Sequence, residues 1–256
     1  MINKGTLVAR KLLQEIGIFD CPDEIPIEKV IQGKGASFKM SPIDNADGRI
    51  VFGDHKAFIT VNSSITYPGK TRFVAAHELG HFVMHKGIQP MFTDDDTTLL
   101  DWYKSGIHEI EANYFASEFL MPEHLVRNYC EDEGFSKSLM EDLADEFQMS
   151  ITATIYKYYN INLYPITLIF SQNGIIKWYR KRDDFPFTYL PPYETKVPVN
   201  TVAGDYFYKK TKREGLEQVY ADNWFTDYNI DSNKQLFETC FYSDRFNFTL
   251  SVLWDH

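Results

Sequence analysis

Two histidines four residues apart are the residues best suited to do chemistry in this sequence. They lie in the pentapeptide His77-Glu78-Leu79-Gly80-His81. Because positions i and i+4 share one face of an α-helix, both imidazoles can bind one metal ion. Zinc accepts two imidazoles, and the intervening Glu78 can act as general base on a water that the metal polarises. The motif therefore indicates a metal-dependent hydrolase that cleaves peptide bonds.

The alternative is a buried helix in which two hydrogen-bonded histidines have only a structural role. A chance occurrence of this motif is expected in roughly 1% of chains of this composition. The flanking sequence predicts the required helix, with a turn at Pro68-Gly69, Thr71 as N-cap and Gly87 as C-terminal stop. Gly80 costs such a helix about 1 kcal/mol relative to Ala. It serves either a close backbone approach beside the metal or tight helix packing.

A catalytic zinc site needs a third protein ligand and one open position. Residues 108–122 predict a second helix that Pro122 ends. Glu109 and Asn113 share one stripe of this helix, whereas Glu111 lies about 200° around the axis from Glu109. We therefore expect Glu109 to be the third ligand and Asn113 to bond a ligand imidazole. From spacing alone, both glutamates could equally be exposed surface residues.

The two motifs, together with Arg72-Phe73 and Leu120-Met121-Pro122, resemble the ImmA/IrrE family of metallopeptidases. The resemblance covers roughly residues 1–160. It implies a gluzincin-like site with His77, His81 and Glu109 as zinc ligands and Glu78 as general base. It also implies a substrate class, the helix-turn-helix repressors that silence mobile elements or stress-response genes. Related thermolysin-like enzymes carry Asp at the position of Asn113, and an amide orients an imidazole less strongly than a carboxylate does.

The predicted fold class is α+β. We expect a zincin-like domain over residues 1–162, made of a small antiparallel sheet at 36–62, the motif helix and a helical bundle. A smaller, mixed α/β domain is expected over residues 163–256. The strand from Ala57 to Asn62 is predicted to be an edge strand that pairs with an extended substrate, which makes both residues candidate substrate contacts. Ordinary sheet structure is the alternative.

The predicted reaction needs a group that stabilises the oxyanion. The candidates for this role or for substrate contact are His85, His108, Tyr103 and Tyr114. His85 also follows His81 by four residues, but a third histidine on a straight helix points past the metal. Residues 88–106 predict a loop between the two helices that carry the ligands, either a lid over the metal or a solvated connector.

A rival function is DNA binding. Residues 137–159 predict two helices joined at Gln148-Met149, a pattern that resembles a helix-turn-helix, although such a pair can also simply pack on the catalytic helices. The second helix offers only Lys157 as a cation for DNA. Residues 1–164 carry 15 Lys and Arg against 24 Asp and Glu. This acidity disfavours a nucleic-acid partner and suits a basic protein substrate, although it is also a common aid to solubility.

Residues 163–256 differ in character from the rest of the chain. They predict a hairpin across residues 171–174, strands at 237–242 and 246–254, and a helix near 202–208. Aromatic residues are dense and no catalytic motif is present. The segment is therefore predicted to be an aromatic-rich antiparallel-sheet domain with a regulatory or substrate-recognition role.

The sequence predicts a cytoplasmic protein with no membrane partner. No apolar run is long enough to span a bilayer, and the first residues lack the apolar region of a signal peptide. Cys21, Cys130 and Cys240 are widely spaced, which fits a reducing compartment. The expected cofactor is one Zn²⁺ per chain, with Mn²⁺ as the alternative. The expected function is that of an endopeptidase; the alternative is a catalytically silent, metal-bound protein that regulates a repressor by binding it.

Overall fold

The computed structural model describes residues 2–18, 26–88, 91–94, 106–131 and 133–255. The described chain divides into two compact units. Unit 1 comprises Met1–Glu131 and Glu141–Lys157, and unit 2 comprises Asp132–Met140 and Tyr158–His256. The predicted division into domains at residues 162 and 163 remains a prediction. Among the described residues, none of the helices is both long enough and apolar enough to cross a membrane.

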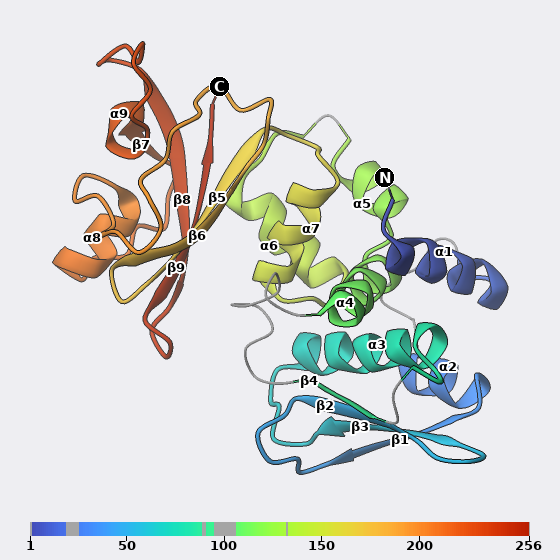
Figure 1. The fold of residues 1–256 in the computed structure, drawn as a ribbon. Coiled ribbons are helices and arrows are strands. Elements are labelled where there is room, and N and C mark those ends of the chain that lie inside the picture. The colour runs from blue at the N-terminus through green and yellow to red at the C-terminus, as the bar shows by residue number, and fades with distance from the viewer. Residues whose placement is uncertain (1, 19–25, 89–90, 95–105, 132, 256) are drawn as a thin grey trace. The chain divides into compact units, whose positions relative to one another are not determined.

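Unit 1 places the helix of the histidine motif between a small sheet and a second helix. The motif helix α3 (Pro68–Met84) packs on the sheet with one side and on α4 (Ile107–Leu120) with the other (Figure 1). Helix α1 (Lys4–Ile16) packs on α4, and α2 (Ile27–Gly33) packs on α3 and the sheet. Three more helices follow: α5 (Glu123–Tyr129), α6 (Lys137–Glu146) and α7 (Ile151–Asn160).

The sheet of unit 1 is mixed, so the prediction that it is antiparallel was wrong. Its strands are β1 (Ala36–Ser41), β2 (Gly48–Phe52), β3 (Ala57–Asn62) and β4 (Met91–Asp94), in the order β1-β3-β2-β4. Strands β2 and β3 form the expected antiparallel pair, but β1 runs parallel to β3. The link from β1 to β2 crosses the end of β3, where the Asn62 amide donates to the carbonyls of Ile43 at 2.9 Å and Ala46 at 2.7 Å. This anchored link carries the chain past β3 instead of closing a tight turn.

Strand β3 is an interior strand, which contradicts its predicted role as an edge strand. It pairs with β1 on one side and with β2 on the other. The edge next to β2 belongs to β4, which lies within the predicted loop at residues 88–106. Its backbone pairs Phe92 with Ile50 and Met91 with Val51. A strand this short, beside a proline and an acidic run, forms because β2 offers it a partner.

Proline residues mark the start of α3 and the C-terminal end of α4. Helix α3 begins at Pro68, and its N-cap is Tyr67, four residues before the predicted cap at Thr71. Proline suits this first position because its φ is already helical and its missing N–H has no partner to lose there. Helix α4 ends at Leu120, as expected from Pro122.

Glycine brings the helices of unit 1 close together. A Cβ added to Gly80 of α3 would lie 3.0 Å from Cδ1 of Phe115 and 3.3 Å from Cα of Ala112, both on α4. A Cβ on Gly5 of α1 would lie 2.0 Å from the carbonyl oxygen of Glu111. Gly80 therefore serves helix packing, and this packing sets how closely the two helices with the candidate ligands approach.

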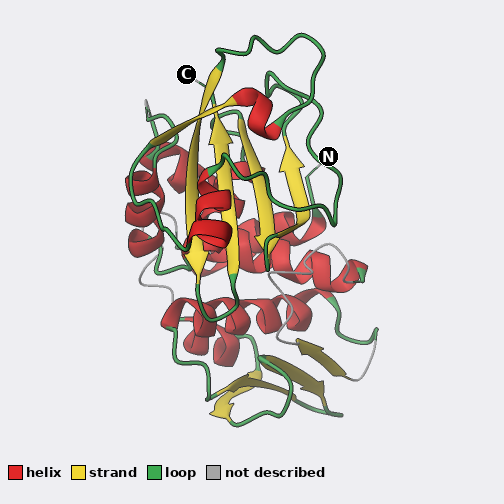
Figure 2. Ribbon diagram, turned by 90° about the vertical axis from the view of Figure 1, so that its left-hand side faces the viewer, coloured by secondary structure: helices red, strands yellow, loops and turns green. Residues whose placement is uncertain are grey.

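Unit 2 is built on a five-stranded antiparallel sheet with the order β6-β5-β9-β8-β7. Its strands are β5 (Ile166–Gln172), β6 (Ile175–Lys181), β7 (Glu217–Tyr220), β8 (Gln235–Ser243) and β9 (Phe248–Trp254). The predicted hairpin joins β5 to β6 through Asn173 and Gly174, whose φ angles of 54° and 76° suit a two-residue turn. Two short helices, α8 (Val202–Lys209) and α9 (Ala221–Trp224), lie on one face of the sheet (Figure 2).

A buried carboxylate ties both short helices of unit 2 to the sheet. Glu238 of β8 accepts hydrogen bonds from the backbone N–H groups of Val202 at 2.9 Å and Ala203 at 3.1 Å. It also accepts one from the indole of Trp224 at 3.0 Å. Burial raises the pKa of this carboxyl above its ordinary value, although these three donors oppose the shift. The arrangement explains a buried acidic residue by helix capping rather than by catalysis.

Lys157 does not lie on an exposed recognition helix. It is buried on α7, and its ammonium lies 2.5 Å from Oε2 of Glu118. Arg10 of α1 reaches the other oxygen of Glu118 at 2.7 Å. The rival hypothesis of DNA binding relied on Lys157 as its cation, and the structure contradicts that role, because this side chain joins α7 to α4 inside unit 1.

Candidate metal centre

Three potential ligand atoms from α3 and α4 converge on one point of unit 1. The Nε2 atoms of His77 and His81 lie 3.0 Å apart. Oε2 of Glu109 lies 3.1 Å from the first and 3.3 Å from the second. Both imidazoles are buried, whereas the Glu109 side chain keeps 27% of its surface exposed. The group is therefore closed on the side of α3 and open to solvent beside α4.

The other nitrogen of each imidazole has its own partner. Nδ1 of His77 lies 2.9 Å from Oδ1 of Asn113, which accepts its hydrogen. Nδ1 of His81 lies 2.9 Å from Nδ1 of His85. A neutral imidazole that donates through Nδ1 presents a lone pair on Nε2. The bond to Asn113 thus makes Nε2 of His77 an acceptor aimed at the point that Glu109 also faces, and Nε2 of His81 is an acceptor there when this ring donates to His85.

This donor set fits a metal ion. When both rings carry their hydrogen on Nδ1, two lone pairs and one carboxylate oxygen face one another within 3.3 Å. Such an arrangement is repulsive until a cation lies among the three atoms. Two imidazoles and one carboxylate with an open side are the ligands of many catalytic zinc sites.

The pKa shifts of His81 and Glu109 also favour metal binding. Burial lowers the pKa of His81 to about 4, although Glu109 opposes this effect. Burial raises the pKa of Glu109, but the two imidazoles outweigh it and hold this pKa well below its ordinary value. At neutral pH the His81 imidazole is therefore neutral and the Glu109 carboxylate is ionised, which are the forms that bind a metal.

Glu78 lies on α3 beside a glycine of the sheet. Its side chain is buried, as is Gly48 at the start of β2. A Cβ at Gly48 would lie 2.6 Å from Oε1 of Glu78 and 2.5 Å from Cγ1 of Val74. Any side chain at position 48 would collide with the Glu78 carboxylate, so its present position requires glycine there. The sequence gives no sign of this role, because Gly48 lies thirty positions away and reads as part of a turn.

Several predicted substrate or oxyanion contacts lie elsewhere. His85 is fully buried, with its ring nitrogens bonded to His81 and Glu111, so the prediction that it contacts substrate was wrong. Tyr103 lies outside the described residues. Tyr114 is half-buried on α4, and its role stays a prediction. The His108 ring lies 4.7 Å from the His85 ring, and these two residues form a second group with Glu111.

Ala57 and Asn62 do not form a substrate-binding edge. Both belong to the interior strand β3. The amide of Asn62 is buried and bonded to the 43–46 link on its nitrogen and to Ser64 on its oxygen. The predicted substrate contact at these two residues was therefore wrong, since their hydrogen-bonding capacity belongs to the sheet.

Phe92 of β4 is a neighbour of the site that sequence analysis missed. Its ring stacks on the His81 imidazole with the centroids 4.1 Å apart and the planes 25° apart. It is also buried, which shields the imidazole from solvent on that face. No signal in the sequence could have found it, because its position depends on the pairing of β4 with β2.

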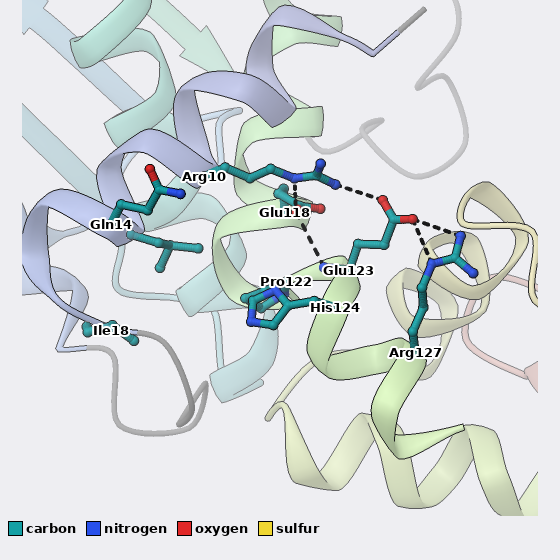
Figure 3. Close-up of a pocket in the computed structure, with 9 residues that line it drawn as sticks. Arg10, Gln14, Ile18, Glu118, Pro122, Glu123, His124 and Arg127 are labelled. Carbon is teal, nitrogen blue, oxygen red and sulfur yellow. Dashed lines mark hydrogen bonds and ion pairs between the residues drawn. The ribbon is translucent and has the colours of Figure 1, made fainter. Parts of the chain in front are cut away.

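The pocket in Figure 3 is separate from this centre. It has a volume of about 360 Å³ and is lined by α1, the end of α4 and α5. Its charged groups bond one another: Arg10 reaches Glu118 and Glu123, each at 2.7 Å, and Glu123 reaches Arg127 at 2.8 Å. The residues that line this pocket belong to neither of the candidate metal-binding groups found among the described residues.

Comparisons with known proteins relate part of this chain to a peptidase family. A family model described as the IrrE N-terminal-like domain, a peptidase family, matches residues 33–159. The chain is 35% identical over 72 residues to the uncharacterized immunity region protein 2 of Bacillus phage phi105. That match spans 28% of this chain and 42% of the phage protein, less than half of its length.

A solved structure shows the same fold over nearly the whole chain. It is named as a Mycobacterium tuberculosis transcriptional regulator, and it superposes with a TM-score of 0.66 at 17% sequence identity. The match covers 99% of this chain and 77% of the regulator. At this identity the likeness concerns the fold. The match includes both helices that carry the candidate ligands, so the resemblance seen in the sequence is confirmed: residues 33–159 of this chain match the IrrE N-terminal-like domain, a peptidase family.

Proposed function

We propose that this chain is a zinc-dependent endopeptidase of the cytoplasm that cleaves a helix-turn-helix repressor. The observation that carries the proposal is the convergence of three ligand atoms from His77, His81 and Glu109 within 3.3 Å of one another. These residues hold the ion. A bound Zn²⁺ supplies Lewis acidity, which activates a water and polarises the scissile carbonyl.

Glu78 is the proton carrier in this mechanism. Its carboxylate takes the proton from the attacking water and gives it to the leaving amine. Gly48 supports this role, because it leaves room for the carboxylate between α3 and β2. Asn113 accepts a hydrogen bond from His77 and so keeps Nε2 of that ring directed at the metal position.

The substrate is expected to bind in extended form along β4. Among the described strands, β4 lies at the edge of the sheet, with β2 as its neighbour. Its Phe92 stacks on His81, which puts this edge beside the candidate ligands. An edge strand offers backbone hydrogen bonds to an added strand, so sequence preference arises mainly from side-chain pockets.

Charge and family context support a repressor as the substrate. Residues 1–164 carry nine more acidic than basic residues, which favours a basic partner such as a DNA-binding protein. The matched phage protein is named for an immunity region.

The test is cleavage of the helix-turn-helix repressor encoded nearest the gene, followed by mass spectrometry of new N-termini. Glu78→Gln should keep its zinc and lose about 10²- to 10⁴-fold in cleavage rate, because it removes general-base catalysis. Glu131→Gln, at an exposed position, is the matched control and should cleave as the wild type does. Equal cleavage by wild type and Glu78→Gln would refute the peptidase mechanism.

A catalytically silent regulator is the second candidate, favoured by the name of the matched transcriptional regulator. It predicts that the zinc-loaded wild type binds the repressor without cutting it. In that case Glu78→Gln and wild type should bind the repressor equally, and no new N-terminus should appear.

A further inference from the structure

A chain of polar groups extends from His81 away from the candidate metal position to the surface of unit 1. Nδ1 of His81 lies 2.9 Å from Nδ1 of His85. Nε2 of His85 lies 2.9 Å from Oε2 of Glu111, and the ammonium of Lys4 lies 2.9 Å from the same oxygen. The chain joins three helices, because His85 follows α3, Glu111 lies on α4 and Lys4 begins α1.

Each hydrogen bond in this chain has a defined direction. A His81 ring that binds a metal through Nε2 carries its hydrogen on Nδ1, so it donates to His85. His85 accepts on Nδ1 and therefore carries its own hydrogen on Nε2, from which it donates to Glu111. Lys4 can only donate, so Glu111 accepts from both sides as an ionised carboxylate.

From this pattern we propose that His85 and Glu111 are positioning residues that hold His81 in its ligand orientation, with Lys4 fixing Glu111. The inference rests on the proposed metal site. In this arrangement each histidine ligand has one orienting acceptor: Asn113 for His77, and His85 for His81. The acceptor for His81 is a neutral imidazole whose own orientation depends on a carboxylate.

The three residues that follow His81 in this chain differ in how deeply they are buried. His85 is fully buried, the Glu111 side chain is 13% exposed, and the Lys4 side chain is 51% exposed. A fully buried hydrogen bond is costly to break, whereas a half-exposed ion pair contributes little. The effect on metal binding should therefore be largest at His85 and smallest at Lys4.

A second metal site is the competing explanation for this cluster. Ligand atoms of His85, His108 and Glu111 lie within 4.8 Å of one another. However, both nitrogens of His85 already have partners in His81 and Glu111. The Lys4 ammonium also places a positive charge 2.9 Å from the oxygen that such an ion would need. The geometry thus favours a hydrogen-bonded chain over a second ion.

The test uses the full-length, metal-free protein and two readouts, zinc affinity by competition with a chromophoric chelator and the visible spectrum of the Co²⁺-loaded form. His85→Phe keeps a ring but removes the acceptor, and it should weaken zinc binding about 10- to 100-fold and alter the Co²⁺ spectrum. His85→Asn puts an amide oxygen near the position of Nδ1 and should restore most of the affinity. Lys4→Met should weaken binding by at most about fivefold.

The matched control is His108→Phe, which should leave zinc affinity and stoichiometry unchanged. Circular dichroism of the metal-free variants checks folding, and Glu111→Leu replaces His85→Phe if the latter is unfolded, with the same direction of change expected. Wild-type affinity and spectrum in His85→Phe would overturn the proposal. Two zinc ions per wild-type chain, with one lost in both His85→Phe and His108→Phe, would replace it by a second metal site. A wild type that binds no zinc would instead refute the proposed function itself.

Discussion

The amide of Asn113 determines how firmly one of the two histidines is oriented. Its oxygen accepts from Nδ1 of His77 at 2.9 Å, whereas its buried nitrogen has no hydrogen-bond partner among the described residues. An aspartate here would keep the acceptor, remove the unsatisfied N–H groups and add a charge that strengthens the hydrogen bond. Asn113 can therefore orient the His77 imidazole, but it holds the ring less strongly than a carboxylate would.

The role of Asn113 predicts different zinc affinities for two substitutions of similar size. Asn113→Leu should weaken zinc binding about 10- to 100-fold, because His77 loses its orienting acceptor. Asn113→Asp should bind zinc at least as tightly as the wild type. Chelator competition at neutral pH measures both, and tighter zinc binding by Asn113→Leu than by Asn113→Asp would contradict the assigned role.

At the residue scale, the sequence predicts what helix geometry alone determines. His77 and His81 must share a face because they lie one turn apart, and Glu109 and Asn113 share a stripe for the same reason. The neighbours that come from other segments could not be predicted in this way. Gly48 lies beside Glu78, and Phe92 lies on His81, only because β2 and β4 pair beneath α3.

At the scale of elements, the distance between α3 and α4 controls the geometry of the site. Gly80 allows the close approach, since any Cβ there would lie 3.0 Å from Phe115 and 3.3 Å from the backbone of Ala112. Helix α4 carries Glu109, so a small displacement of this helix moves the third ligand away from the two imidazoles.

Gly80→Ala should therefore weaken zinc binding even though alanine favours a helix by about 1 kcal/mol. We expect a loss of roughly tenfold, the lower end of what a disturbed metal surrounding costs. Gly33→Ala is the matched control, because nothing lies within 4 Å of its added Cβ. Isothermal titration with zinc compares the two, and equal affinity in both would show that α4 tolerates the added methyl group without moving.

The helices and the β5–β6 hairpin could be predicted, whereas the sheet topology of unit 1 could not. Helix periodicity and turn residues are local signals, and Asn173-Gly174 is among the strongest of them. The parallel pairing of β1 with β3 depends on the link that Asn62 anchors. Strand β4 depends on a partner forty residues earlier, so its four residues were assigned to a loop.

At the scale of the whole molecule, metal binding should contribute directly to stability. The candidate ligands lie on α3 and α4, and α4 also packs on α1. Because the unfolded chain does not hold the site together, zinc at about 100 times its dissociation constant stabilises the fold by about 2.7 kcal/mol. The unfolding transition that includes these helices should shift to higher temperature with zinc and return with a chelator.

The metal-free protein should lose stability as the pH falls. The pKa of His81 is lowered from 6.5 to about 4 by burial, so the unfolded chain binds its proton more readily. The free energy of unfolding is therefore highest above pH 6.5. It falls as the pH decreases from 6.5 to 4, by on the order of 1–2 kcal/mol at pH 5. Calorimetry of the apo protein measures this trend. His81→Gln should reduce it, whereas His55→Gln, at an exposed position, should not. A transition temperature that does not change from pH 7 to 5 would show that His81 is not buried as a neutral ring.

The most direct test of the account is the metal content of the purified wild type and of Glu109→Gln, measured side by side by elemental analysis. In the proposed site Glu109 is the ligand that joins the two helices, so metal binding requires it. We predict about one zinc per wild-type chain and a clear loss in Glu109→Gln. A wild type that holds no metal after incubation with zinc would contradict the account and leave His77 and His81 as packed histidines of the core.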